Sequence, residues 1–131
     1  MATSAVQRRV VARTVAVLVI VLGLVYGVRV AWLFVMATEG DVPASSSVPL
    51  PSGATIVSEE TDCASGGCWL LLRVDPPAGQ SADDLAAALG ATPQFQIPGN
   101  FLDPRTISVE AASVGSMLEI RVDYWSPKWV L

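Results

Sequence analysis

The sequence contains no histidine and only two cysteines, Cys63 and Cys68. Without histidine, a Ser-His-Asp triad, a Cys-His pair and every histidine-ligated metal site are excluded. Two cysteines are too few for a four-ligand zinc site, and the four residues between them do not match the two-residue spacing of a thioredoxin-like redox motif. We therefore expect no cofactor, no metal centre and no enzymatic activity.

Basic residues are also scarce, and they are distributed unevenly. Residues 1–38 hold four arginines and no acidic residue, so their formal charge is +4. Residues 39–131 have a formal charge of −8, because all 12 acidic residues and only four basic ones lie there. Nucleic-acid binding and adsorption onto anionic lipid headgroups both depend on lysine and arginine, so we expect the acidic part to do neither.

What the sequence does have is a long hydrophobic run near its N-terminus. The run covers residues 14–37, is interrupted by a single charge at Arg29, and follows three arginines. A helix needs about 20 mostly apolar residues to cross the hydrocarbon core of a bilayer. We predict a transmembrane helix at 14–37 after a basic cytoplasmic segment at 1–13. Arginines remain on the cytoplasmic side, so the acidic part is expected outside the plasma membrane.

Arg29 lies in the outer part of this run. We expect its aliphatic stem to follow the helix while the guanidinium reaches the outer headgroups. The alternative is a salt bridge to an acidic residue of a partner helix. A signal peptidase could accept the small residues Val35 and Ala37, but the run far exceeds the apolar core of a signal peptide. We favour an uncleaved anchor, with cleavage near Ala37 as the alternative.

Small residues form one strip along the predicted membrane helix. Gly23 and Gly27 are four residues apart, and Ala31 extends the strip by one turn. Such a strip lets a second helix approach closely. Together with Arg29 it is a candidate packing site for a membrane-protein partner or a second copy of the chain. The alternative is that it has no role, because glycine is common in membrane helices.

Residues 38–53 have the composition of a linker. They contain three prolines and four serines and almost no large apolar side chain, which favours a semi-extended segment. Residues 54–131 then form a small extracytoplasmic domain. We predict a disulfide between Cys63 and Cys68, in agreement with an oxidising location. A loop this short shapes a local turn more than it secures the whole fold.

The domain is predicted to be α+β, with one short helix packed on a small antiparallel sheet of about four strands in the order β-β-α-β-β. Strand 69–75 is expected to be covered largely on both faces. Residues 91–105 are expected to form an irregular loop whose aromatic residues pack on the core and which can include a short strand at 94–97. The remaining expected elements are strands at 54–60, 106–112 and 117–124 and a helix at 82–89 between Ser81 and Gly90.

Two groups of carboxylates are candidate sites. The first, beside the cysteines, could bind calcium, but it lacks the spacing of a calcium loop, and a solvated turn is the preferred interpretation. The second lies on the polar face of the last hairpin, where paired carboxylates could support glycoside hydrolysis. We expect an ordinary exposed face without a pocket there. The groups are Glu59, Glu60 and Asp62, and Glu110, Glu119 and Asp123 around Arg121.

The C-terminal tail is apolar, which is unusual for a chain end. Trp125, Trp129 and Leu131 are its main apolar side chains. Either the tail packs back over the domain core or it offers an apolar patch to a partner or to the membrane surface. The sequence favours neither alternative.

The richness in alanine and valine resembles that of envelope proteins of high-GC bacteria. The leading hypothesis is a bacterial, single-pass membrane-anchored protein whose acidic domain acts as a non-catalytic interaction module or accessory subunit of a membrane complex. Its expected partners are the lipid bilayer and a membrane protein or a second copy. The alternative is an extracytoplasmic ligand-binding or sensing module, which should contain a concave apolar pocket.

Overall fold

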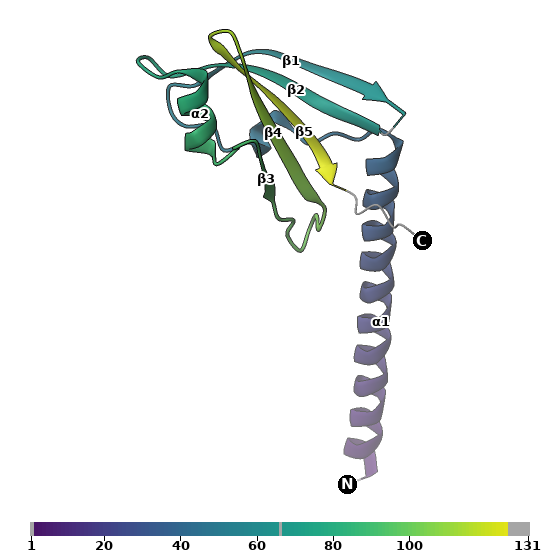
Figure 1. Ribbon diagram of the computed structural model, residues 1–131. Helices are drawn as coiled ribbons and strands as arrows, with labels where there is room; N and C mark the ends of the chain where they lie inside the picture. Colours follow the sequence, from purple (N-terminus) through teal and green to yellow (C-terminus); the bar gives the residue numbers. More distant parts are fainter. Residues whose placement is uncertain (1, 66, 126–131) are drawn as a thin grey trace. The chain divides into compact units, whose positions relative to one another are not determined.

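The computed structural model describes residues 2–65 and 67–125 of the 131-residue chain. The chain divides into two compact units, Met1–Trp32 and Leu33–Leu131, which are described separately. The elements, drawn in Figure 1, are α1 (Ala2–Glu39), a 3₁₀ turn η1 (Ser45–Ser47), β1 (Thr55–Ala64), β2 (Gly67–Asp75), α2 (Ala82–Leu89), β3 (Gln94–Ile97), β4 (Thr106–Val114) and β5 (Met117–Trp125).

Helix α1 contains the whole of the predicted membrane segment. It is long and apolar enough to cross a membrane, judged by length and composition. The helix ends at Gly40, whose φ of 117° is one that side-chain-bearing residues rarely adopt. The amide of Asp41 donates to the carbonyl of Met36 at 3.0 Å, which closes the last turn in the manner of a Schellman motif.

The sheet has five strands, so the predicted count of about four is wrong. The strand order is β1-β2-β5-β4-β3, and every neighbouring pair is antiparallel. The additional strand is β3, which lies within the predicted 91–105 loop and pairs with β4 through Phe95↔Val109. Phe95 and Ile97 alternate with exposed glutamines and pack against the core, which is why this short segment pairs as an edge strand.

Helix α2 forms where the sequence predicts it. The Ser81 hydroxyl accepts from the amide of Asp84 at 3.1 Å, and the Asp84 carboxylate accepts from the amide of Ser81 at 2.9 Å. This reciprocal capping box also lowers the pKa of Asp84, first through the backbone bond from Ser81. The helix ends at Gly90, which has a φ of 76°.

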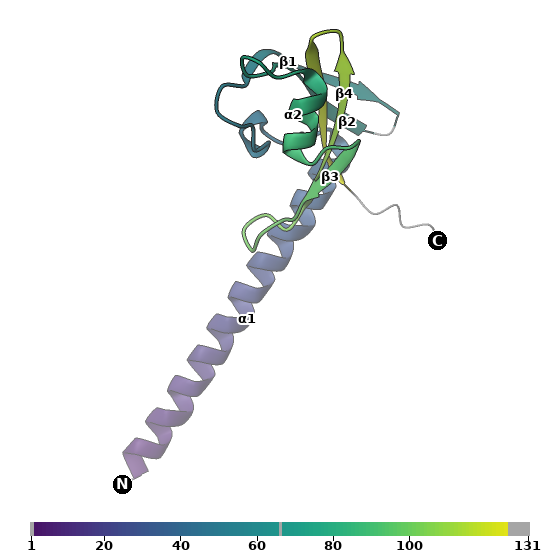
Figure 2. The ribbon, with the colours of Figure 1, turned by 60° about the vertical axis from the view of Figure 1, so that its left-hand side comes forward.

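One face of the sheet carries the hydrophobic core. Alternate residues of the strands point to this face, and α2 lies against it over β4 and β5 (Figures 1 and 2). Leu85 of α2 is completely buried there. The strand residues of the core are Leu70, Leu72, Val74, Val109, Leu118, Ile120 and Val122.

The segment predicted as a linker also packs on this core. Val48 is buried, Pro43 is among the fully buried side chains, and Val42 and Leu50 are packed against the core cluster. Backbone bonds of the η1 turn, such as Val48 N–H to Ser45 O at 3.2 Å, order the segment between these contacts. Residues 41–50 are therefore part of the compact unit.

Two packing expectations are wrong. Phe101 and Leu102 do not lie on the core, because their side chains are 75% and 67% exposed. Strand β2 is covered on one face only, since Trp69 and Leu71 are half-buried and Arg73 is exposed. Outside the sheet, the described residues that pack on the core come from α2, the 41–50 segment and Ala54.

Truncation of a core residue should lower the free energy of unfolding much more than truncation of an exposed residue. We predict that Leu72→Ala, at a position with no exposed surface, lowers the free energy of unfolding by about 3 kcal/mol, because it leaves a cavity in a packed core. Denaturant unfolding of the full chain monitored by tryptophan fluorescence measures the loss. The control is Val57→Ala at the irregular position of β1, where 56% exposure predicts a change within about 0.5 kcal/mol.

Candidate functional site

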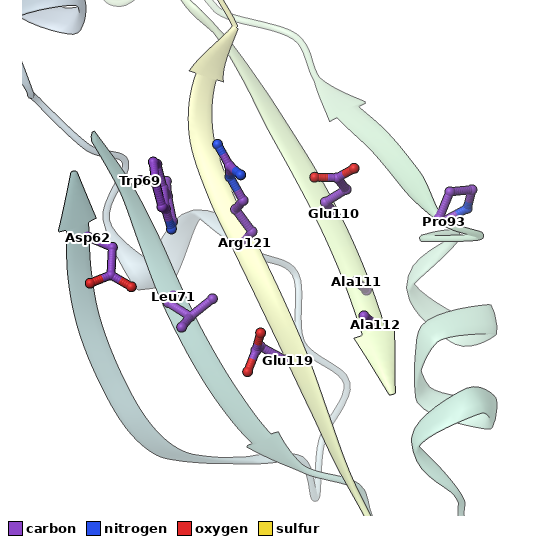
Figure 3. Close-up of a pocket in the computed structure, with 9 residues that line it drawn as sticks. All are labelled: Asp62, Trp69, Leu71, Pro93, Glu110, Ala111, Ala112, Glu119 and Arg121. Carbon is purple, nitrogen blue, oxygen red and sulfur yellow. The ribbon is translucent and has the colours of Figure 1, made fainter. Parts of the chain in front are cut away.

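The face of the sheet opposite the core presents the candidate site. Residues of β2 and β5 that alternate with the core residues point to it, and their registers place Leu71 opposite Arg121 and Arg73 opposite Glu119. On the next strand, Glu110 of β4 lies opposite Arg121. Figure 3 shows Leu71, Glu110, Glu119 and Arg121 on neighbouring strands. We call this surface the outer face.

The outer face holds an open groove of about 450 Å³. Both polar and apolar side chains line it, and they come from β1, β2, β4, β5 and the residue before β3. The expectation of a face without a pocket is therefore wrong at this place. The lining residues are Asp62, Trp69, Leu71, Pro93, Glu110, Ala111, Ala112, Glu119 and Arg121 (Figure 3).

An arginine stacked on a tryptophan forms the centre of the groove. The guanidinium carbon of Arg121 lies 4.0 Å from the centroid of the Trp69 ring. The same guanidinium lies 3.8 Å from a carboxylate oxygen of Asp123. A cation over an aromatic face is held by the ring quadrupole, so the stack keeps the two side chains together in a half-exposed setting.

The carboxylates of the outer face differ in their surroundings. Glu119 lies 3.7 Å from the guanidinium of Arg73. Asp62 and Glu110 make no ion pair within 4.0 Å among residues 2–65 and 67–125. Burial raises the pKa of Asp123, and Glu110 adds to this effect, while Arg121 opposes it. The site thus combines a central cation with unneutralised acids at its two sides.

Neither candidate carboxylate group forms a cluster that could hold a metal ion. Glu59, Glu60 and Asp62 lie along strand β1 and not in a turn, and all three are exposed. Alternation along the strand separates Glu59 from the other two by face. In the described part of the chain, no group of three or more potential ligands comes together.

A second constellation, which the sequence does not reveal, surrounds Arg105. This residue is only 6% exposed. Its Nε and Nη2 donate to the two carboxylate oxygens of Asp103 at 2.8 and 2.7 Å. Its Nη1 donates to Asp41 at 2.7 Å and to the carbonyl of Leu33 at 3.2 Å, and the guanidinium lies 3.7 Å over the Tyr124 ring. We call this set the Arg105 clamp.

The loop before Arg105 is shaped to present the clamp. The Asn100 side-chain carbonyl accepts from the amides of Leu102 and Asp103, both at 2.9 Å. A Cβ at Gly99 would lie 2.3 Å from a backbone atom of Pro104, so only glycine permits this close approach. The hydrogen bonds from Arg105 to Asp103 raise the pKa of Arg105, so the clamp stays charged. In the sequence, only the short Asp-Pro-Arg run, residues 103–105, places two members of the Arg105 clamp close together.

The predicted disulfide between Cys63 and Cys68 is present at the β1–β2 turn. Its Cys68 sulfur packs against Gly40, where an added Cβ would lie 3.0 Å from Sγ. The end of α1, the disulfide and the clamp are therefore neighbours within the unit that begins at Leu33.

The remaining candidate residues stay predictions. A Cβ at Gly23 or Gly27 would meet no atom within 4 Å, and Ala31 and Arg29 are exposed on α1. Of the tail, only the backbone of Trp125 is placed, at the end of β5 opposite Thr106. Trp129 and Leu131 lie outside the described residues.

Comparison with protein-family models, with curated proteins and with solved structures found no match to this chain. We therefore describe the protein by its architecture alone. It consists of a long apolar N-terminal helix and an α+β unit in which one short helix packs on a five-stranded antiparallel sheet.

The raised pKa of Asp123 predicts a pH-dependent effect of Asp123→Asn. A raised folded-state pKa favours folding below the ordinary value of 3.8, and this contribution is lost as the pH rises through the folded value. The Asn variant should therefore melt higher than the wild type at about pH 7 and equally at about pH 3. Glu59→Gln controls for the loss of one exposed negative charge, and an Asp123→Asn difference that is constant with pH would contradict the assignment.

Removal of the Arg105 guanidinium should weaken the compact unit. We predict that Arg105→Met lowers the free energy of unfolding by about 2 kcal/mol, since it leaves Asp41 and Asp103 without their charged donor while both remain reachable by water. Arg105→Lys should retain only part of the stability, because an ammonium cannot form the two-pronged contact with Asp103. Arg73→Ala, at a 54% exposed ion pair, is the control and should change the stability little.

Proposed function

We propose that this protein is a single-pass, membrane-anchored envelope protein of bacteria whose α+β domain binds another protein, as an accessory subunit of a membrane complex. The observation that carries the proposal is the outer face, where an aromatic–arginine pair and a half-buried leucine line a groove that no other described element of the compact unit covers. An antiparallel sheet commonly faces water on one side, and here Trp69 and Leu71 lie among the charged residues of that side.

We place the N-terminus in the cytoplasm and the domain outside, because the four arginines precede or lie within the apolar run and all acids follow it. The buried guanidinium of Arg105 contacts the carbonyl of Leu33, and charged groups are costly in hydrocarbon. The hydrocarbon span is therefore proposed to end before Leu33. Residues 14–32 form a helix ~28 Å long, which fits a core about 30 Å thick.

The second candidate function is a ligand-binding or sensing module. In its favour, a groove of about 450 Å³ lies within the size range of small-molecule sites. Such sites are mostly apolar and enclosed, whereas this groove is open and carries four charged side chains. Interaction with a protein segment accounts for both its openness and its charge.

A photo-crosslinker tests the proposed contact in the membrane. We predict that p-benzoylphenylalanine at Leu71 in the full chain, irradiated in the membranes of the cells that make the protein, yields one discrete adduct with a membrane or envelope protein. The same group at the exposed Ala88 of α2 is the control and should give no such adduct. A chain that stays uncrosslinked at Leu71 and migrates as a monomer after extraction would refute the proposal.

A further inference from the structure

The arginines of the compact unit that the structure describes are already engaged by its own groups. Arg73 lies against Glu119, Arg105 is bound to Asp41 and Asp103, and Arg121 is stacked on Trp69 beside Asp123. Asp62 and Glu110 make no ion pair within 4.0 Å in the described ranges, although Glu110 lies opposite Arg121. The groove therefore carries two carboxylates that make no ion pair with the described residues and are available to a cationic ligand.

The two groove-lining carboxylates that make no ion pair lie on opposite sides of the groove. Asp62 is on β1 opposite Trp69, and Glu110 is on β4 opposite Arg121. In the strand order β1-β2-β5-β4, three strand spacings separate them. At about 4.8 Å per spacing their strands lie ~14 Å apart, and the registers offset Asp62 from Glu110 by two residues, so their Cα atoms lie ~16 Å apart with Trp69 and Leu71 of β2 between them, a span that flexible lysine or arginine side chains can reach.

We infer that the groove receives an extended segment of an extracytoplasmic protein with two lysines or arginines about four residues apart and an apolar residue midway. An extended chain rises about 3.3 Å per residue, so side chains four residues apart point the same way and lie ~13 Å apart. The cations reach Asp62 and Glu110, and the apolar residue packs on Trp69 and Leu71. This inference rests on the proposed function and names the partner's chemistry.

Other occupants fit the groove less well. A second copy placed face to face would set Asp62 and Glu110 against equal charges, and anionic headgroups are repelled in the same way. A sugar ring stacks on an open aromatic face, and Arg121 already occupies one of the two faces of Trp69. The remaining competitor is the chain's own tail with Lys128, which the experiment distinguishes.

The test uses the full chain in nanodiscs of zwitterionic phosphatidylcholine and the peptide acetyl-Lys-Ala-Leu-Ala-Lys-amide. The readout is the indole N–H resonance of Trp69, assigned by its loss in Trp69→Phe. The inference expects a saturable shift that weakens as salt is added. The peptide with both lysines replaced by glutamate should cause none. No shift with the lysine peptide, or an equal shift with the glutamate peptide, would overturn the inference.

Matched variants test whether Asp62 and Glu110 are the carboxylates that bind the lysine peptide. Asp62→Asn together with Glu110→Gln should weaken binding of the lysine peptide about tenfold, as expected for the loss of two solvent-exposed ion pairs. Glu59→Gln removes a charge from the same strand on the other face and should leave the affinity unchanged. Equal effects of the two changes would mean that only net charge matters, which would contradict the inference.

Two further outcomes separate the hypotheses. If the peptide binds only to a chain that ends at Trp125, the tail is the occupant and the inference is overturned. If the peptide does not bind but Leu71 still crosslinks to a partner, the partner's inferred chemistry is wrong while the proposed function stands. If both experiments fail, the outer face is not an interaction surface.

Discussion

The stability of the compact unit depends on the hydrogen bonds and ion pairs that the buried guanidinium of Arg105 makes. A buried cation is tolerated only when its donors are paired, and here two carboxylates, a backbone carbonyl and the Tyr124 ring surround it. These partners come from segments far apart in the sequence. By binding Asp41 and Leu33 as well as Asp103, Arg105 joins the end of α1 to the sheet, so the residues that follow α1 do not form a free spacer.

This attachment also determines which face of the sheet is covered. Once residues 41–50 lie on the core face beside α2, Pro43 and Val48 complete the core, and the short chain has no further described element with which to cover the outer face. Trp69, Leu71 and Arg121 then remain at the surface as a groove with acids at its sides. Because α2 and residues 41–50 pack on the core face, the outer face stays uncovered by described elements. The proposed function rests on that outer face.

The sequence predicted most of the local structure. Helix α2, its capping residues, the last hairpin and the disulfide follow from period-two alternation, cap chemistry and cysteine spacing. The features that it did not predict depend on tertiary contacts. Prolines flank the four-residue strand β3, so the sequence there mainly predicts a loop. The packing of Pro43 is not predicted because its segment has the composition of a linker. The Arg105 clamp is not predicted because its partners are distant in the sequence. The groove is not predicted because it forms only when four strands pair in register.

The most direct test of this account is hydrogen–deuterium exchange of residues 41–50 in the full chain embedded in a bilayer. Their amides, among them Asp41, Ser47, Val48 and Leu50, donate backbone bonds within a segment packed on the core. We predict that these amides exchange slowly in the wild type and at least tenfold faster in Arg105→Met, because release of Asp41 lets the segment open. Rapid exchange in the wild type, as in a solvated linker, would contradict it.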